Sequence, residues 1–349
     1  MSQSPCLYCR GTDFEPLWQR VRDRLAFVPG EWSFLRCCRC RSAGLHPRPD
    51  LSAPASFYPP VYDLTPRRFQ QNDAGGFHRI LDRIEYLFFF RPQYRAQARR
   101  IRRLTESPRP GRKKLLDLGC GGGLRLLSLR EAGFDVEGAD FRKEVINSLE
   151  QDLGIPAFVL DTHRLRPSEA APGASAHPPG KELPAGSYDV VTAFHLLEHL
   201  ADISSFLNDT YRLIKPGGWF IAVLPWMESL QAWLFGARWC AATEAPRHLS
   251  IPSGNGIRRL LRETGFEEPI IRADALLSNI STAVLSVLPA AGRRHTVGTE
   301  GGAVRRILLL LLAAGAGLVF GPFCWVESAL NRSAIVWVAA RKPSAAVNP

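Results

Sequence analysis

Short apolar runs and amphipathic segments alternate along the chain from residue 113 onward. The runs KKLLDLG, FDVEGAD and YDVVTAFH have the length and apolar content of buried strands, and LRLLSLREAG and EVINSLEQDLG between them have helical spacing. PAFVLD and WFIAVLP extend the series of strands. Such an alternation of strand and helix favours an α/β fold, built on a parallel sheet with helices packed against its faces.

The chain before residue 113 has a different character. Residues 1–62 are rich in loops and end in the Pro-rich stretches HPRPDLSAP and YPPVYDLTP, so we expect a separate leader there. Residues 63–112 form a basic linker, with a helix over 77–106 that breaks near Pro92. The α/β domain is expected over 113–342, with a Pro-, Ala- and Gly-rich surface loop at 166–184.

Charge is distributed unevenly between these parts. The 349 residues include 44 Lys and Arg against 33 Asp and Glu, a formal net charge of +11. Residues 1–112 hold 20 basic and 10 acidic side chains, which leaves 24 and 23 for the rest. The basic excess therefore lies almost entirely in residues 1–112, and a uniformly basic surface is not predicted. The apolar content of 46% is typical of a globular protein and excludes a disordered one.

A glycine-rich turn follows the first strand of the α/β domain. Its glycines are Gly119, Gly121 and Gly123. Glycine permits close approach of a ligand to the turn and to the N-terminus of the helix. Asp117 lies at the end of the strand, and Asp140 ends the next strand, where a carboxylate can accept both hydroxyls of a ribose. The alternative is an ordinary turn with a solvated aspartate. The G-x-G-x-G spacing differs from the dinucleotide fingerprint, whose third glycine would fall at Leu124.

These motifs in this order resemble class I S-adenosylmethionine-dependent methyltransferases over residues 113–342. DLGCGGG matches the first motif of that family, and GAD matches its ribose-binding acid. The resemblance implies a Rossmann-like sheet, parallel with one antiparallel strand, and S-adenosylmethionine as methyl donor. It also implies a set of donor-binding residues, namely Asp117, Gly119, Cys120, Gly121, Gly123, Asp140, Phe141, Asp161, Thr162, Phe194, His195 and Leu196.

Residues 195–199, HLLEH, read literally as H-x-x-E-H, a pattern of zinc peptidases. A peptidase site needs this pattern inside a helix, whereas here it begins at the end of an apolar strand. We interpret His195 as a catalytic or donor-pocket residue that handles a proton, with a structural histidine as the alternative. His248, in a Pro-Arg-His element that resembles one at the acceptor rim of related methyltransferases, is a second candidate base, or else a residue that fixes its loop.

Five of the eight cysteines lie within the first 40 residues. Cys6 and Cys9, and again Cys37 and Cys40, are separated by two residues, a spacing typical of a tetrahedral Zn(Cys)4 site. Four thiolates leave no open position, so this zinc would be structural. The alternative is unrelated free thiols. The leader, through about residue 65, resembles the zinc ribbon attached to a group of bacterial methyltransferases, many of which act in cell-surface polysaccharide or small-molecule pathways.

An apolar insertion at about 274–330 separates the last two expected strands, GFEEPIIR and AIVWVAARK. Its second apolar run, 307–326, has 20 residues without a charge, long enough to span a bilayer. It contains Pro322 and three glycines, however, and both flanking strands belong to one sheet. We therefore predict an interfacial or shallow re-entrant helical hairpin with arginines at lipid headgroups. A buried cap, a dimer face and a true span are the alternatives.

The expected function is methyl transfer from S-adenosylmethionine to a small-molecule, lipid-linked or saccharide acceptor at a membrane surface. The expected location is the cytoplasm, peripheral on the inner face of the cell membrane, because no secretory signal is visible and the basic excess fits an anionic surface. One alternative is an RNA methyltransferase that grips phosphates with its zinc ribbon and basic helix. Another is a non-catalytic, membrane-associated adaptor.

Overall fold

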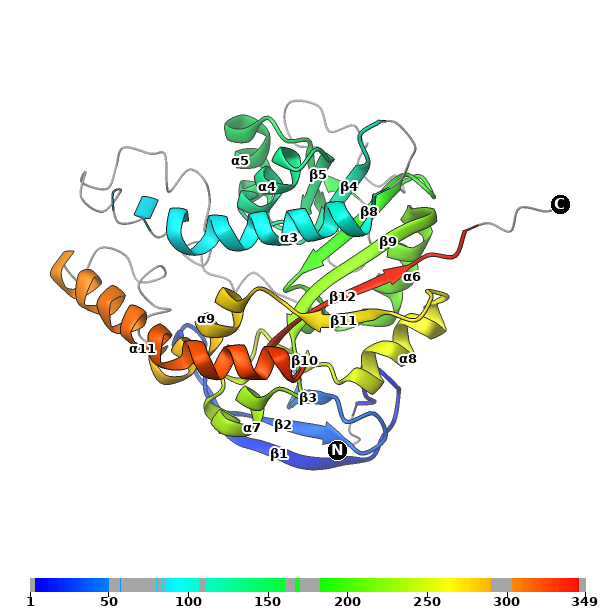
Figure 1. The fold of residues 1–349 in the computed structure, drawn as a ribbon. Coiled ribbons are helices and arrows are strands. Elements are labelled where there is room, and N and C mark those ends of the chain that lie inside the picture. Colours follow the sequence, from blue (N-terminus) through cyan, green and yellow to red (C-terminus); the bar gives the residue numbers. More distant parts are fainter. Residues whose placement is uncertain are drawn as a thin grey trace.

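Two β-sheets organise the chain (Figure 1). The computed structural model describes residues 4–49, 57, 80, 83–84, 86–106, 111–160, 167–169, 183–289 and 303–344. The larger sheet has the strand order β11-β12-β9-β8-β4-β5-β6-β7. Its strands are β4 (Lys114–Leu118), β5 (Asp135–Asp140), β6 (Ala157–Leu160), β7 (Pro167–Glu169), β8 (Tyr188–Phe194), β9 (Ile214–Pro225), β11 (Ile270–Ala273) and β12 (Ile335–Arg341).

The direction of the strands confirms the predicted Rossmann-like methyltransferase sheet. β4 is parallel to β5 and β8, β5 is parallel to β6, and β8 is parallel to β9. β12 runs antiparallel to both β9 and β11, as predicted. β7 adds a second antiparallel strand beside β6, so part of the region expected to be a surface loop extends the sheet edge.

Helices cover both faces of this sheet. The neighbouring residues Leu115 and Leu116 of β4 are both fully buried and belong to opposite cores, because successive side chains of a strand point to opposite faces. One core holds side chains from α3 (Arg91–Leu104), α4 (Leu124–Glu131) and α5 (Lys143–Leu153). The other core holds side chains from α6 (Ile203–Leu213) and α8 (Gly254–Thr264). A π-helical turn, η3 (Tyr86–Phe90), precedes α3, and Pro92 lies in the first turn of α3.

The smaller sheet joins the leader to a distant part of the chain. Its strands are β1 (Phe14–Val21), β2 (Trp32–Cys37), β3 (Ala43–His46) and β10 (Ser250–Ile251). β10 pairs antiparallel with β3 and follows the segment that holds α7 (Leu230–Phe235), η5 (Gly236–Arg238) and η6 (Ala242–Glu244). Trp18 of β1 packs edge-to-face on Trp239, with ring centroids 5.9 Å apart. The predicted domain boundary at residue 62 stays a prediction.

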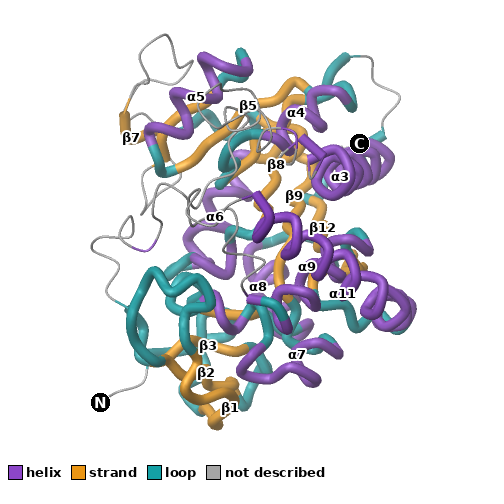
Figure 2. Tube along the Cα trace, turned by 90° about the vertical axis from the view of Figure 1, so that its left-hand side faces the viewer, coloured by secondary structure: helices purple, strands orange, loops and turns teal. Residues whose placement is uncertain are grey.

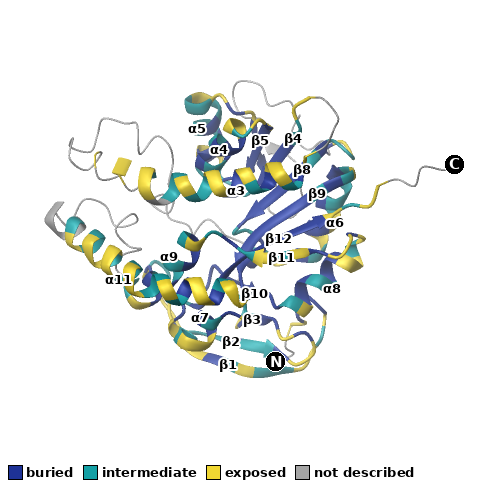
Figure 3. Ribbon diagram, viewed as in Figure 1, coloured by how far each residue is buried: buried dark blue, intermediate teal, exposed yellow. Residues whose placement is uncertain are grey.

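A helical hairpin extends to one side of the molecule between β11 and β12, as predicted (Figures 1 and 2). It consists of α9 (Leu276–Val287) and α11 (Ala303–Ala329), with Pro322 inside α11. Residues Ile307–Ala329 are long and apolar enough to cross a membrane, with a mean hydropathy of 2.3. Only 6% of that apolar window is buried, so α11 is not a buried cap (Figure 3). Its strongly exposed side chains include Leu308, Leu311, Leu312, Leu318, Val319 and Trp325.

Candidate functional site

The carboxyl ends of β4, β5 and β8 meet at one edge of the sheet, where ligands of open α/β folds bind. The turn after β4 contains three glycines with φ of +69°, +50° and +76°, namely Gly119, Gly121 and Gly123. A Cβ built on Gly123 would lie 2.1 Å from Leu149 Cδ2, whereas one on Gly121 would meet no described atom within 4 Å. The third glycine therefore serves helix packing, and the second leaves open space above the turn.

Asp140 fixes the glycine turn from the neighbouring strand. Its carboxylate accepts hydrogen bonds from the backbone N–H of Gly121 at 3.1 Å and of Arg142 at 3.1 Å. The Arg142 Nε also donates to Asp140 Oδ1 at 3.0 Å, and the guanidinium lies 5.2 Å from the centroid of the Phe141 ring. Asp140 is 2% exposed. An acid predicted to bind ribose is thus held rigidly beside the second glycine.

Asp117 is a buried acid with an unsatisfied oxygen. Thr192 Oγ1 donates to its Oδ1 at 2.7 Å, while its Oδ2 has no hydrogen-bond partner among the described residues. Burial raises the pKa of Asp117 to about 6, against the opposing effects of the Arg125 charge and the Thr192 hydrogen bond. A carboxylate so placed is stabilised by a cationic group that reaches it.

Arg125 is a functional candidate that the sequence reasoning missed. Its guanidinium lies 4.0 Å from the centroid of the Phe194 ring and 4.8 Å from that of Tyr94 on α3. Its Nε donates to Gln97 Oε1 at 3.2 Å. The signal available in the sequence is an arginine in the first turn of the helix after the glycines, a position at the ligand-binding edge. Aromatic side chains thus hold a cation near the acid of the same edge.

His195 lies directly after β8 with a left-handed backbone, φ +53°. Such a conformation is unfavourable for a non-glycine residue by about 1–3 kcal/mol, and residues that adopt it are often found at functional sites as well as in turns. The His195 backbone N–H donates to Val223 O at 2.7 Å, and the imidazole side chain is 38% exposed. Leu196 covers the first glycine, since its Cδ1 would lie 3.0 Å from a Cβ on Gly119. His195 is therefore at the open edge of the sheet, where its proposed role requires it.

The other predicted donor residues are placed differently. Phe194 is buried beneath Arg125. Cys120 is also buried, and burial raises the pKa of its thiol well above the ordinary value. Asp161 and Thr162 lie outside the described residues.

His248 is buried behind this edge instead of lining it. Its imidazole is part of a cluster with Glu198 and His199, and its Nδ1 is 2.7 Å from Ala241 O. Burial, followed by the charge of His199, lowers the pKa of His248 to about 4. With the residue only 8% exposed, contact with an acceptor is not favoured by this geometry, and its role as a base stays a prediction.

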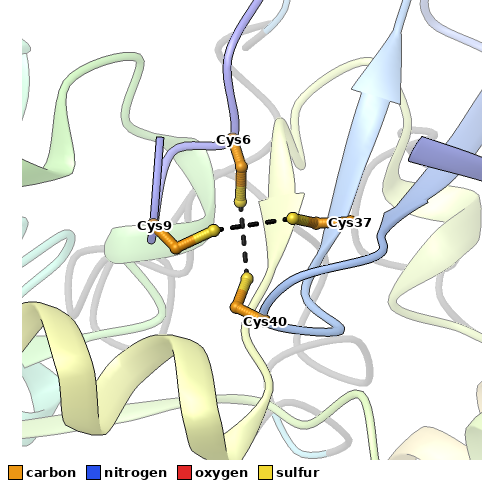
Figure 4. A group of neighbouring side chains, drawn as sticks. All are labelled: Cys6, Cys9, Cys37 and Cys40. Atoms are coloured by element: carbon orange, nitrogen blue, oxygen red, sulfur yellow. Dashed lines mark hydrogen bonds between the residues drawn. The ribbon is translucent and has the colours of Figure 1, made fainter. Parts of the chain in front are cut away.

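The predicted zinc ligands form one compact group of buried thiols (Figure 4). Cys6 Sγ lies 3.5 Å from Cys40 Sγ, and Cys9 Sγ lies 3.5 Å from Cys37 Sγ. Four sulfurs at the Zn–S distance of 2.3 Å would be about 3.8 Å apart in a tetrahedron, so the group has nearly the required size. The fifth leader cysteine, Cys38, is exposed and outside the group.

Comparison with known proteins places similar sequences in one enzyme class. A family model described as "Methyltransferase domain" matches residues 89–268. A ubiquinone biosynthesis O-methyltransferase of Thiobacillus denitrificans is 34% identical over 131 residues, which cover 37% of this chain and 52% of the relative. One of Pseudomonas aeruginosa is 32% identical over 143 residues, which cover 40% and 55%. The chain thus spans about half the length of these curated relatives.

Solved structures with a similar arrangement include two methyltransferases. A putative sarcosine dimethylglycine methyltransferase from Galdieria sulphuraria has a TM-score of 0.43 at 13% identity and covers 72% of this chain and 84% of its own. A Haemonchus contortus phosphoethanolamine N-methyltransferase in complex with S-adenosyl-L-methionine has a TM-score of 0.45 at 16% identity, with 78% and 61% covered.

Proposed function

The chain belongs to the class I S-adenosylmethionine-dependent methyltransferase family, and on that premise we propose that it transfers a methyl group to a small-molecule acceptor at a membrane surface. The observation that carries the proposal is the edge of β4, β5 and β8, where Asp117 and Asp140 flank a turn of left-handed glycines. Those two acids and the turn match the polar groups at the two ends of the donor.

The donor has a ribose at one end of its sulfonium and an amino acid at the other. Asp140 is placed to accept the ribose hydroxyls beside Gly121. The α-ammonium supplies the cation that the unpartnered Oδ2 of Asp117 lacks. The carboxylate of the same amino acid fits the guanidinium of Arg125, which is held between two rings and within electrostatic range of Asp117.

When bound, S-adenosylmethionine supplies a methyl group activated by the positive sulfur. The residues of the chain align donor and acceptor for in-line displacement and exclude water. If the acceptor is a hydroxyl, its proton must be removed, and His195 at the open edge is the base we propose. The relatives named as O-methyltransferases of ubiquinone biosynthesis make a hydroxyl on a lipid-linked molecule the first acceptor to test.

Exposed apolar side chains support the membrane part of the proposal. Leu318 and Val319 of α11 are 80% and 74% exposed, and Trp233 of α7 is 79% exposed. Phe88, just before α3, is 68% exposed. The N-terminal end of α3 extends toward the same side of the molecule as α11 (Figure 1). An apolar helix exposed to this extent is stabilised by insertion at a lipid interface. We place the protein in the cytoplasm, at the inner face of the cell membrane.

We also propose a structural zinc at Cys6, Cys9, Cys37 and Cys40. The size of the sulfur group and the burial of all four thiols support it. Each pair is closed by a tight turn, since the N–H of Arg10 donates to Cys6 O and that of Arg41 to Cys37 O, both at 2.9 Å.

Isothermal titration calorimetry with S-adenosylmethionine tests donor binding. We expect Asp140→Ala to weaken binding at least 10-fold, because the ribose loses its acceptor. Asp135→Ala, at the exposed start of the same strand, is the matched control and should bind as the wild type does. An absence of binding to the wild type, or equal binding by Asp140→Ala, would refute the proposal.

Flotation with vesicles tests whether the exposed apolar side chains of α11 bind a membrane. The wild type should float with phosphatidylglycerol-containing vesicles, and the double variant Leu318→Glu, Val319→Glu should stay in the soluble fraction. Ile270→Glu changes an apolar residue of β11 that is 37% exposed and lies outside the hairpin, so it should still float. A wild type that stays soluble and sediments as a dimer would assign α11 to a protein interface instead.

Transfer of tritiated methyl groups into lipid, polysaccharide and RNA fractions of the source cell tests the acceptor class. Label in the lipid fraction is expected. Label confined to RNA would overturn the proposed acceptor.

A further inference from the structure

Glu198 is a fully buried carboxylate without a hydrogen-bond partner among the described residues. It is 0% exposed, and within that part of the chain both of its carboxylate oxygens lack such a partner. Leaving a carboxylate unpaired away from water is strongly unfavourable, so buried acids are paired, hydrogen-bonded or bound to metal. Neither the donor site nor the cysteine group uses this side chain, which makes its surroundings informative.

Three histidines surround this carboxylate. His195 Nδ1 lies 3.5 Å and His248 Nε2 lies 4.0 Å from Glu198 Oε1. The rings of His199 and His248 are 4.7 Å apart, centroid to centroid. Glu198, His199 and His248 each offer a ligand atom, all within 4.8 Å of one another. Glu198 and His199 come from η4 (Leu197–His199), while His248 comes from the segment before β10.

Backbone carbonyls orient two of the rings. His199 Nδ1 is 3.0 Å from Arg247 O, and His248 Nδ1 is 2.7 Å from Ala241 O. A carbonyl oxygen only accepts, so each ring carries its hydrogen on Nδ1, and in a neutral ring Nε2 then holds the lone pair. Donation of one ring N–H to a carbonyl is the arrangement that fixes metal-binding histidines.

The spacing separates a metal site from a simple ion pair. A charge-assisted hydrogen bond from an imidazolium to a carboxylate would bring nitrogen and oxygen to about 2.7–2.9 Å. Among Glu198, His199 and His248, the His248 Nε2 lies 4.0 Å from Glu198 Oε1, and all three ligand atoms are within 4.8 Å of one another. Ligands bound at about 2.0–2.2 Å around one tetrahedral ion are about 3.4 Å apart, so the 4.0 Å separation is closer to that of neighbouring ligands than to that of an ion pair.

We propose that Glu198, His199 and His248 bind a divalent zinc ion, separate from the cysteine group. Two histidines and one carboxylate leave a coordination position open, unlike four thiolates. The half-exposed His195 is the cluster's neighbour toward the sheet edge. The HLLEH sequence thus supplies two ligands, and its first histidine stays on the open side, so the peptidase arrangement does not apply. If the acceptor is a hydroxyl, which rests on the proposed function, the ion supplies a Lewis acid near that edge.

Metal content of the full-length protein tests the proposal. After equilibration with zinc and desalting, elemental analysis should find two zinc ions per wild-type chain. Glu198→Gln and His248→Gln should each retain one, with the affinity of the lost site reduced at least about 100-fold, since even outer-shell changes reduce it about 10- to 100-fold. Glu137→Gln is the matched control, because it changes a buried carboxylate that accepts from Tyr188 Oη at 2.7 Å and should retain two.

Cobalt binding to the wild type distinguishes the two sites, and this measurement remains informative if a variant does not fold. In the wild type, one equivalent of Co²⁺ should show thiolate charge-transfer absorption from the cysteine group, and a second should show only weak visible bands. A single cobalt per wild-type chain that shows thiolate charge-transfer absorption, or a second cobalt with such absorption, would overturn the proposal, as would two zinc ions in a folded His248→Gln. Donor calorimetry is independent of these readouts, so failure of the proposed function is recognised separately.

Discussion

Substitution of Asp117 by Asn should change the pH dependence of stability in a defined way. Asp117 is 1% exposed, and burial raises the pKa of its carboxyl to about 6, compared with an ordinary value of 3.8. Between these two pH values the unfolded chain releases the proton while the folded chain retains it. The folded state is therefore progressively destabilised as the pH rises from about 4 to about 6. Asn carries no proton to release, so this pH dependence disappears in the variant.

The size of the effect follows from the shift. A difference of about 2 pKa units at about 1.4 kcal/mol each gives a full destabilisation on the order of 3 kcal/mol above pH 6. Roughly half of it has already developed at pH 5. Between pH 5 and pH 7.5 the stability of Asp117→Asn relative to the wild type should therefore rise by about 1.4 kcal/mol. Any constant cost of the new amide, on the order of 1–3 kcal/mol, cancels in this comparison.

Urea denaturation at the two pH values measures the difference, with Asp135→Asn as an exposed control that should follow the wild type. The same Asn variant should bind S-adenosylmethionine at least 10-fold more weakly, because the α-ammonium loses its anion. A relative stability that is flat with pH would show that Asp117 is not a strained acid. An unchanged affinity of Asp117→Asn for S-adenosylmethionine would show that Asp117 does not bind the donor, whether or not it is strained.

Three further changes probe the donor edge and the leader. Arg125→Ala should weaken binding of S-adenosylmethionine by about 10- to 100-fold in calorimetry, from the loss of a charge-assisted hydrogen bond, and an unchanged affinity would exclude the proposed carboxylate contact. Arg247→Ala should lower the free energy of unfolding by about 3–5 kcal/mol, because the buried Asp23 loses its cationic partner and the buried Glu244 is left with Arg24. A loss below about 1 kcal/mol in urea denaturation would contradict this. Cys9→Ser removes a ligand of the proposed structural zinc and should lower the thermal midpoint by roughly 10 °C, if the lost stabilisation is on the order of 5 kcal/mol. An unchanged midpoint would argue against a structural zinc.

Local periodicity was sufficient for the strands of the larger sheet other than β7, because strand and helix patterns repeat within a few residues. β7 lies in a region whose composition predicted a surface loop. The glycine turn was equally accessible, since its function depends on consecutive residues. The partners of β3 were not accessible in this way. β3 pairs with β10 across more than half of the chain, and two residues of β10 carry no strand signal of their own. Pairing of this kind is set by tertiary contacts.

Side-chain pairing also limited the sequence reasoning about charge. Counting residues indicated a basic leader, but Arg22, Arg24, Arg36 and Arg41 each form an ion pair. Their partners are Glu31, Glu244 and Glu15, the last of which pairs with two arginines. These cations are engaged within the protein, so a net charge does not measure the positive surface available to phosphates or lipids.

The buried ion pairs have an additional effect on pH stability. Burial alone would raise the pKa of Glu244, but Arg24 and Arg247 outweigh it and lower that pKa well below its usual range. A carboxylate with a lowered pKa stabilises the folded state at neutral pH, and this contribution is lost as the pH falls. Asp117 acts in the opposite sense, so acid relieves strain at the donor edge while weakening the ion pairs between the leader and the η6 segment.

The contacts of the leader connect the cysteine group to the proposed second metal site. Ser253 Oγ donates to Cys40 O, and Tyr8 Oη lies 3.1 Å from Ser250 Oγ, so both knuckles are tied to the β10 region. The N–H of Leu249 donates to Glu198 O at 2.7 Å, while Leu249 O accepts from the N–H of Leu45 in β3. Leu249, the neighbour of His248 in the chain, is therefore held between the leader and η4 by backbone hydrogen bonds on both sides. A leader that orders these contacts positions His248 against Glu198, as the proposed second metal site requires.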